Sequence, residues 1–208
     1  MSATSAVPPG VIVVLRFAAR ADAETAVRGL AQSSVDAIEL TLTTPDAIAV
    51  LSELRQARPD LRLFAGTVRT LEQVRACSDA GVDGIVSPHT DPRLVTRALE
   101  LGLSVVPGAL TPSEVTAARA LGASAVKVFP VGLVGGAAYV RAVREPLPDI
   151  PLVASGLIEL HEVGDYLAAG CLAVCLGGAL VDAGAIARGD ADGVAAYADA
   201  RLAEARRL

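Results

Sequence analysis

Short segments rich in β-branched residues recur along the chain every 20 to 27 residues. Longer segments between them are rich in Ala, Leu, Arg and Glu and have the period of an amphipathic helix. Each interval has room for one strand, one helix and two short loops. Eight strand–helix units in 208 residues favour a small (β/α)8 TIM barrel, an α/β fold, as a single domain over residues 1–208. The expected strands are Val11–Arg16, Ala37–Leu42, Leu61–Gly66, Gly84–Ser87, Ser104–Pro107, Ala125–Phe129, Leu152–Ser155 and Ala173–Leu176.

Proline positions support the same order of elements. Thr44-Pro45, Asp91-Pro92 and Thr111-Pro112 each place an N-cap residue before a proline at the first helical position. A doubly wound sheet is the main alternative, and it usually has a glycine-rich turn after its first strand. Here that strand ends in Leu15-Arg16-Phe17, and no phosphate-binding G-x-x-x-x-G-K-[ST] motif occurs.

Charge and composition exclude several classes of partner. A net charge of −5 has the wrong sign for a protein that binds nucleic acid or an anionic membrane surface. No apolar run is long enough to span a membrane, and Met1–Gly10 lacks the features of a signal peptide. Three cysteines do not form a disulfide framework, and neither histidine is near Cys171 and Cys175, so we expect no metal site. We therefore expect a cytoplasmic protein without metal or cofactor, with no nucleic-acid or membrane partner.

Lys127 is the one lysine among 18 basic residues. It lies in the apolar segment Ala125–Phe129, where a solvated cation is not expected. Alternate residues of a barrel strand point to the axis and to the helices. Because Val126 and Val128 suit the helices, we expect Lys127 to point into the barrel.

Three further polar side chains are expected at the same end of the barrel. Glu39 alternates with apolar residues on the second strand, so it points inward. Arg16 ends the first strand on the inward face, and Thr67 is expected to point inward together with Ala65 at the end of the third strand. Active sites of TIM barrels lie at this carboxyl end of the strands.

These four residues predict carbonyl chemistry. A lysine amine freed of its proton attacks a carbonyl to form an imine, which withdraws electrons from a neighbouring C–C bond. Glu39 can then move a proton, Arg16 can hold a substrate carboxylate, and Thr67 can supply a hydroxyl. Two structural alternatives remain open at this point: a Lys127–Glu39 ion pair that only fills the barrel, and an Arg16 salt bridge at a strand end.

Five short blocks resemble the 2-keto-3-deoxy-6-phosphogluconate (KDPG) aldolase family, which also contains the 2-keto-3-deoxy-6-phosphogalactonate (KDPGal) and 4-hydroxy-2-oxoglutarate aldolases. The blocks are Ile38-Glu39-Leu40-Thr41-Leu42, Ala65-Gly66-Thr67-Val68, Val86-Ser87-Pro88, Val106-Pro107-Gly108 and Val126-Lys127-Val128-Phe129-Pro130. The resemblance implies a class I aldolase that needs no metal and is a homotrimer.

The resemblance also implies roles for individual residues. Lys127 matches the Schiff-base lysine, Glu39 the general acid/base, and Thr67 a threonine near the pyruvate carboxylate. Phe129 and Pro88 match residues packed around the imine.

Two departures from the family pattern bear on the substrate. Enzymes for the gluconate substrate have an arginine where this chain has Thr43, whereas enzymes for the galactonate substrate have one at the end of strand 1, as Arg16 is here. The resemblance therefore favours the galactonate branch and a carboxylate-binding role for Arg16.

The second departure is at the phosphate site. The family's glycine-rich segments after strands 7 and 8, which hold phosphate, read Ser155-Gly156 and Gly177-Gly178-Ala179 here, with Ser155 a candidate replacement for a lost hydroxyl. We expect Ser155, Gly156, Gly178 and Ala179 to line this end of the site, and the role of His89 stays open.

The predicted reaction is cleavage of a 2-keto-3-deoxy sugar acid, 6-phosphorylated as in KDPG or KDPGal, to pyruvate and an aldehyde such as glyceraldehyde 3-phosphate. Three alternatives remain. One is an aldolase for an unphosphorylated acid such as 4-hydroxy-2-oxoglutarate. The others are a phosphate-sugar isomerase or synthase barrel, and a catalytically silent barrel kept for binding.

Overall fold

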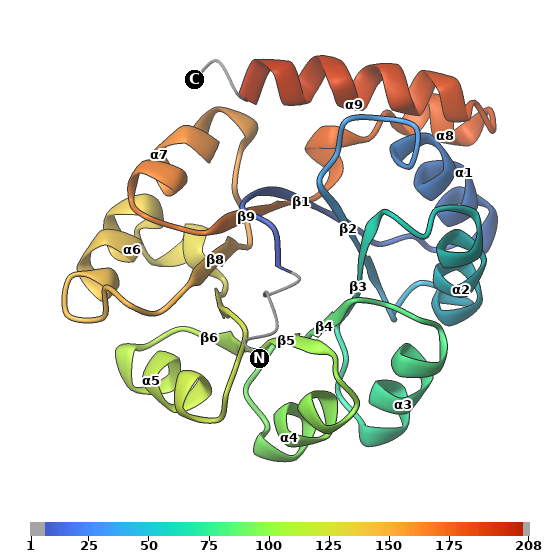
Figure 1. The fold of residues 1–208 in the computed structure, drawn as a ribbon. Coiled ribbons are helices and arrows are strands. Elements are labelled where there is room, and N and C mark those ends of the chain that lie inside the picture. The colour runs from blue at the N-terminus through green and yellow to red at the C-terminus, as the bar shows by residue number, and fades with distance from the viewer. Residues whose placement is uncertain (1–6, 206–208) are drawn as a thin grey trace.

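The computed structural model describes residues 7–205. Its strands form one parallel sheet in the order β5-β4-β3-β2-β1-β9-β8-β7-β6, and the helices surround this ring (Figure 1). The strands are β1 (Gly10–Leu15), β2 (Ala37–Thr41), β3 (Arg62–Gly66), β4 (Gly84–Val86), β5 (Ser104–Val106), β6 (Gly108–Ala109), β7 (Val126–Val128), β8 (Leu152–Ser155) and β9 (Ala173–Leu176). A nearly closed parallel sheet with alternating helices confirms the predicted TIM barrel.

The sheet has nine strands where the sequence predicts eight, because the predicted fifth strand, Ser104–Pro107, ends at Val106 as β5 and a further short strand, β6, follows Pro107. β5 pairs with β4 and β6 pairs with β7, so the two pieces lie at the two ends of the sheet order. A proline has no N–H to donate to a neighbouring strand, which explains the break. The chain closes the ring through Pro107 itself.

The helices follow the strands in the predicted alternation. They are α1 (Arg20–Leu30), α2 (Ala47–Ala57), α3 (Leu71–Asp79), α4 (Pro92–Glu100), α5 (Pro112–Ala120), α6 (Gly136–Arg144), α7 (Val163–Ala168), α8 (Ala183–Ala187) and α9 (Ala191–Ala205), with short 3-10 turns η1 (Val131–Val134), η2 (Leu160–Glu162) and η3 (Gly178–Leu180). None of the helices within residues 7–205 is both long and apolar enough to cross a membrane.

Two of the three predicted proline starts are correct. Thr111 caps α5 in a capping box with Glu114, and Asp91 caps α4 by accepting the Arg93 amide. The prediction for Thr44-Pro45 is wrong, since α2 begins at Ala47. The Thr44 hydroxyl instead accepts the Phe17 amide at 3.1 Å, so it ties the β1 loop to the β2 loop.

Apolar side chains form two separate layers, one inside the barrel and one between the barrel and the helices. The inner layer contains Ile12, Ala37, Phe64 and Val153, and the outer layer contains Val126, Val128 and most of the helix residues. Since Val126 and Val128 face outward, Lys127 between them faces the barrel interior. The alternation predicted from the sequence therefore holds for β7.

Candidate active site

A cavity of about 560 Å³ opens at the carboxyl ends of the strands. All ten residues predicted for the site line it, and they come from most of the barrel's circumference: Arg16, Glu39, Thr67, Pro88, Lys127, Phe129, Ser155, Gly156, Gly178 and Ala179. Thr41 and Cys175 also line the cavity.

Lys127 is held on β7 with only 7% of its surface exposed. Its Nζ lies 5.2 Å from the centre of the Phe129 ring, which attracts a cation weakly. Among residues 7–205, none of the ion pairs within 4.0 Å involves Lys127, so it does not form the structural pair with Glu39 that the sequence left open. The amine is buried, faces the cavity, and is not neutralised by direct contact.

Glu39 is 2% exposed on β2, and its Oε2 has no hydrogen-bond partner among the described residues. Burial raises the pKa of this carboxyl, while the charges of Lys127 and Arg16 oppose the rise. A carboxylate whose pKa is raised is a stronger base, which suits it to accepting a proton and returning it later in the reaction.

The absent side chain of Gly66 makes room for this carboxylate. A Cβ placed at Gly66 would lie 2.0 Å from Glu39 Oε1 and 2.8 Å from Glu39 Cδ. β3 lies directly beside β2, with Thr41 opposite Gly66 in register. Gly66 therefore allows the Glu39 side chain to lie against the backbone of β3, at the floor of the cavity.

Arg16 directly follows β1, and its guanidinium is oriented by threonine hydroxyls. It donates to Thr43 Oγ1 at 2.8 Å and to Thr67 Oγ1 at 3.4 Å. Thr43 Oγ1 in turn lies 3.1 Å from Thr41 Oγ1. Within the described chain Arg16 has no carboxylate partner, so the salt bridge considered from the sequence does not form. The guanidinium retains its charge for an anion in the cavity.

Thr67 reaches the cavity for a reason that the sequence analysis did not foresee. The sequence predicts that Ala65 and Thr67 both point into the barrel. For Ala65 this is wrong, because Ala65 packs in the outer layer and its neighbour Phe64 packs in the inner layer. Thr67 has a φ of 59°, a left-handed conformation that ends the strand's alternation. This turn brings its hydroxyl to Arg16 and to the cavity wall.

The wall after β8 and β9 consists mainly of backbone and small side chains. Gly156 has a φ of 95°, and a Cβ there would lie 2.9 Å from the Phe129 ring, so glycine permits their close approach. Gly178 and Ala179 lie in η3 on the same wall. Leu157 to Glu159, which are not among the residues predicted from the sequence, also line the cavity directly after the predicted pair Ser155-Gly156.

Comparison with known proteins places the chain in a family. A family model described as KDPG and KHG aldolase matches residues 7–197. The chain belongs to this aldolase family. It is 34% identical over 192 residues to the 2-dehydro-3-deoxy-phosphogluconate aldolase of Treponema pallidum, covering 92% of this chain and 91% of the relative.

Two further members of the KDPG and KHG aldolase family are similar over most of their length. The 2-dehydro-3-deoxy-6-phosphogalactonate aldolase of Escherichia coli is 32% identical over 191 residues, covering 91% of this chain and 93% of the relative. The KDPG aldolase of Legionella pneumophila, solved with pyruvate captured as a covalent carbinolamine intermediate, is 25% identical with a TM-score of 0.81, covering 94% of each chain.

The cysteines of this family member are all free and buried. Burial raises the pKa of Cys171 to about 11 and that of Cys77 and Cys175 to about 12. Cys175 lines the cavity but remains a thiol at neutral pH, so it is not a nucleophile there.

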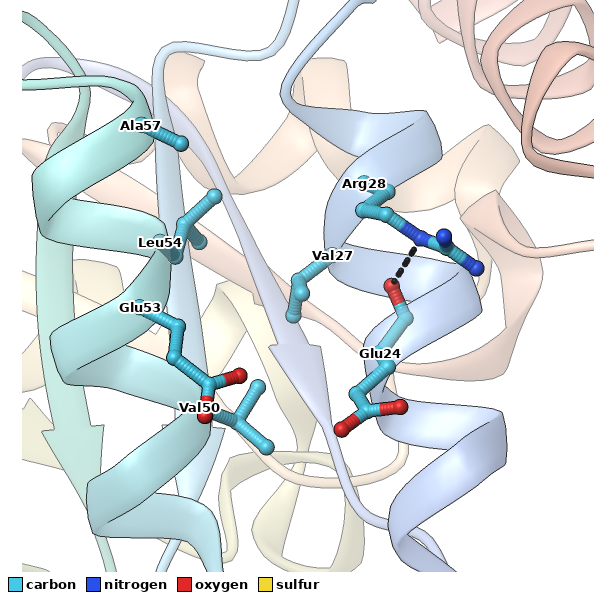
Figure 2. A pocket seen from close by; sticks show the side chains of 7 residues that line it. All are labelled: Glu24, Val27, Arg28, Val50, Glu53, Leu54 and Ala57. Atoms are coloured by element: carbon cyan, nitrogen blue, oxygen red, sulfur yellow. Dashed lines mark hydrogen bonds between the residues drawn. The ribbon is translucent and has the colours of Figure 1, made fainter.

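Two other features lie outside the aldolase cavity. His89 is exposed and is not part of the cavity lining. A hollow of about 360 Å³ lies between α1 and α2, where Glu24 faces Glu53 (Figure 2). Arg20 pairs with both carboxylates, at 2.6 and 2.8 Å. This hollow lies on the outer helical layer, away from the carboxyl ends of the strands.

Proposed function

We propose that this protein is a class I aldolase that cleaves a 2-keto-3-deoxy sugar acid to pyruvate and an aldehyde. One observation carries the proposal: the buried amine of Lys127 faces the same cavity as the unpartnered carboxyl oxygen of Glu39, and neither is used in a direct ion pair. An isomerase or synthase barrel does not require a lone lysine within a strand.

The reaction follows from these two groups. Lys127 Nζ attacks the C2 carbonyl, and loss of water gives an imine. Glu39 removes the proton from the C4 hydroxyl, the C3–C4 bond breaks, and its electron pair passes to the imine as an enamine. The aldehyde leaves, the enamine takes a proton at C3, and water hydrolyses the resulting imine to pyruvate and free Lys127.

The residues around these groups hold the substrate. Arg16 and the Thr67 hydroxyl bind the keto-acid carboxylate next to C2, where a guanidinium offers two parallel donors. Phe129 and Pro88 flank the imine carbon. The contact of Arg16 with Thr43 supports assignment to the galactonate branch, because the guanidinium from strand 1 extends to the position where the gluconate type has its arginine.

Three properties of this chain stay predictions, of which two are drawn from the family resemblance. These two are a homotrimer and a 6-phosphorylated substrate such as KDPG or KDPGal held near Ser155, Gly156, Gly178 and Ala179. The third, a cytoplasmic location, comes instead from the cysteine content of the sequence. Sedimentation equilibrium tests the trimer, and a dominant monomer would contradict it.

Trapping with borohydride tests the reaction. Incubation with pyruvate and borohydride is expected to leave a reduced adduct on the peptide that carries Lys127, as read by mass spectrometry after digestion. Because the chain has no other lysine, an adduct elsewhere can form only on the N-terminal amine. The control is Lys127→Arg, which keeps the charge but cannot form an imine. Cleavage by this variant, or absence of the adduct in the unaltered protein, would refute the mechanism.

A further inference from the structure

The charged groups of the cavity are unevenly distributed around its wall. Four charged side chains line it, and the two cations, Arg16 and Lys127, belong to β1 and β7. The wall formed after β8 and β9 comprises residues 155–159 and 177–179. Among these described residues Glu159 is the one charged side chain. The side chains of the wall formed after β8 and β9 therefore carry a net negative charge.

Lys127, on the strand next to β8, is the residue assigned to the imine, and the other cation of the cavity, Arg16, does not face this wall. Arg16 lies beside β9 in the ring, but its guanidinium is turned the other way, toward the hydroxyls of Thr43 and Thr67 after β2 and β3. Glu159 is exposed and has no ion pair among residues 7–205. Its charge is therefore not neutralised by a neighbouring side chain.

The backbone amides at the start of η2 do not offset the negative charge of Glu159. The amide of Glu159 donates to Glu162 Oε2 at 2.8 Å, and the amide of Glu162 donates to the Glu159 carbonyl at 3.0 Å. Backbone amides at such a turn stabilise a phosphate only when they are free to point at it. Here both amides are already bonded, and a second carboxylate lies beside the first.

Leu157 places an exposed apolar side chain on the same wall. It is 70% exposed and has a φ of 56°, a left-handed conformation that favours glycine. An apolar side chain is thus kept at the mouth of the cavity despite an unfavourable backbone conformation. It presents apolar surface at the mouth of the cavity, and this surface offers a charged group no hydrogen-bond donor.

We propose that this wall selects an aldehyde half without a phosphate or carboxylate, such as a short neutral hydroxyaldehyde, and that Glu159 discriminates against anionic tails. The inference rests on the aldolase function proposed above and departs from the phosphorylated substrate that the family resemblance implies. A carboxylate accepts hydrogen bonds from sugar hydroxyls and repels an anion at the same distance. Ser155 provides a second hydroxyl contact on this wall.

The test compares three aldehydes in condensation with pyruvate: D-glyceraldehyde, D-glyceraldehyde 3-phosphate and glyoxylate. We expect kcat/KM for glyceraldehyde to exceed that for each anionic aldehyde about tenfold or more, because like charges brought together disfavour binding. Glu159→Gln removes the charge at nearly constant shape and is expected to raise the phosphorylated-to-neutral ratio about tenfold.

The matched control is Glu145→Gln, an exposed glutamate at the C-terminal end of α6, which is expected to leave the ratio unchanged. Preference of the unaltered enzyme for glyceraldehyde 3-phosphate, or a ratio that Glu159→Gln does not move, would overturn the inference.

Pyruvate trapping in the same preparations separates the two proposals. An adduct on Lys127 together with preference for the phosphorylated aldehyde overturns the substrate inference and leaves the aldolase function intact. Absence of both adduct and condensation overturns the aldolase function and, with it, the inference that rests on it.

Discussion

Gly66→Ala is expected to impair the reaction by displacing Glu39 while the barrel remains folded. The new Cβ would lie 2.0 Å from Glu39 Oε1, so the carboxylate must retreat by about 1.4 Å to reach the 3.4 Å of ordinary contact. Gly66 lies within β3 and has no positive φ, so the alanine itself fits the backbone. The flexible glutamate can move into the open cavity, and we expect the free energy of unfolding to change by less than about 1 kcal/mol.

The expected loss is in the proton transfer. Misplacement of a reacting group by about 1 Å can lower a rate about 100-fold, which corresponds to about 2.7 kcal/mol of transition-state stabilisation. The assay is kcat for cleavage, followed by pyruvate release. Borohydride trapping of pyruvate on Lys127 should persist in this variant, because Lys127 is not touched by the change.

Gly102→Ala is the control for this experiment. Its Cβ would meet nothing within 4 Å, but its φ of +76° is costly for alanine, so we expect a loss of about 1 kcal/mol in stability with normal kcat. Gly66→Ala is thus expected to lower activity with little change in stability, and Gly102→Ala to lower stability with little change in activity. A kcat for Gly66→Ala within about threefold of the unaltered enzyme would refute the assignment of Glu39 as the proton-transfer group.

Three further predictions concern charge and burial. Because burial raises the pKa of Glu39 above 4.5, its contribution to stability is largest at low pH and is lost as pH rises through the folded-state pKa. Glu39→Gln should therefore gain stability relative to the unaltered protein as pH rises, and a difference in urea denaturation that does not vary with pH would contradict this. Arg16→Lys should raise KM for the keto acid about tenfold, because lysine lacks the two parallel donors of the guanidinium. Thr43→Val should raise KM about threefold, because Arg16 keeps its donors and loses only a hydroxyl that orients them. Equal KM values for the two variants would be inconsistent with this order. All three cysteines should resist a thiol reagent such as iodoacetamide at pH 8 in the folded protein and react once it is unfolded, and rapid alkylation of the native chain would count against their raised pKa values.

The orientation of Lys127 could be predicted because apolar residues on both sides fix the faces of its strand. Val126 and Val128 pack in the outer layer, and a single-residue error in register would have placed both inside the barrel. The same argument places Glu39 correctly, between Ile38 and Leu40.

Alternation has no predictive value once a strand ends. Thr67 enters the cavity because its backbone is in a left-handed conformation, and a Gly-Thr pair in the sequence does not predict that conformation. Thr44-Pro45 resembles a helix start, but the Thr44 hydroxyl bonds to the Phe17 amide of another loop. Such a contact joins residues distant in sequence, so local preference does not indicate it.

The segment Leu157 to Glu159 was missed for a similar reason. Nothing in the sequence distinguishes Leu157 from an apolar residue of an ordinary loop, and the family pattern includes only the glycine before it. The available signal was the carboxylate of Glu159, four residues after Ser155, at the end of the strand.

The break at Pro107 gives the barrel a seam, and Lys127 lies on it. The Lys127 amide donates to the Pro107 carbonyl at 2.9 Å, and Lys127 is in register with Gly108 on one side and Val153 on the other. The residue to which we assign the chemistry thus also supplies a hydrogen bond that closes the ring. Opening of the seam exposes this amide to solvent, so its hydrogen-exchange rate reports the fraction of time in which the seam, and with it the active site, is open.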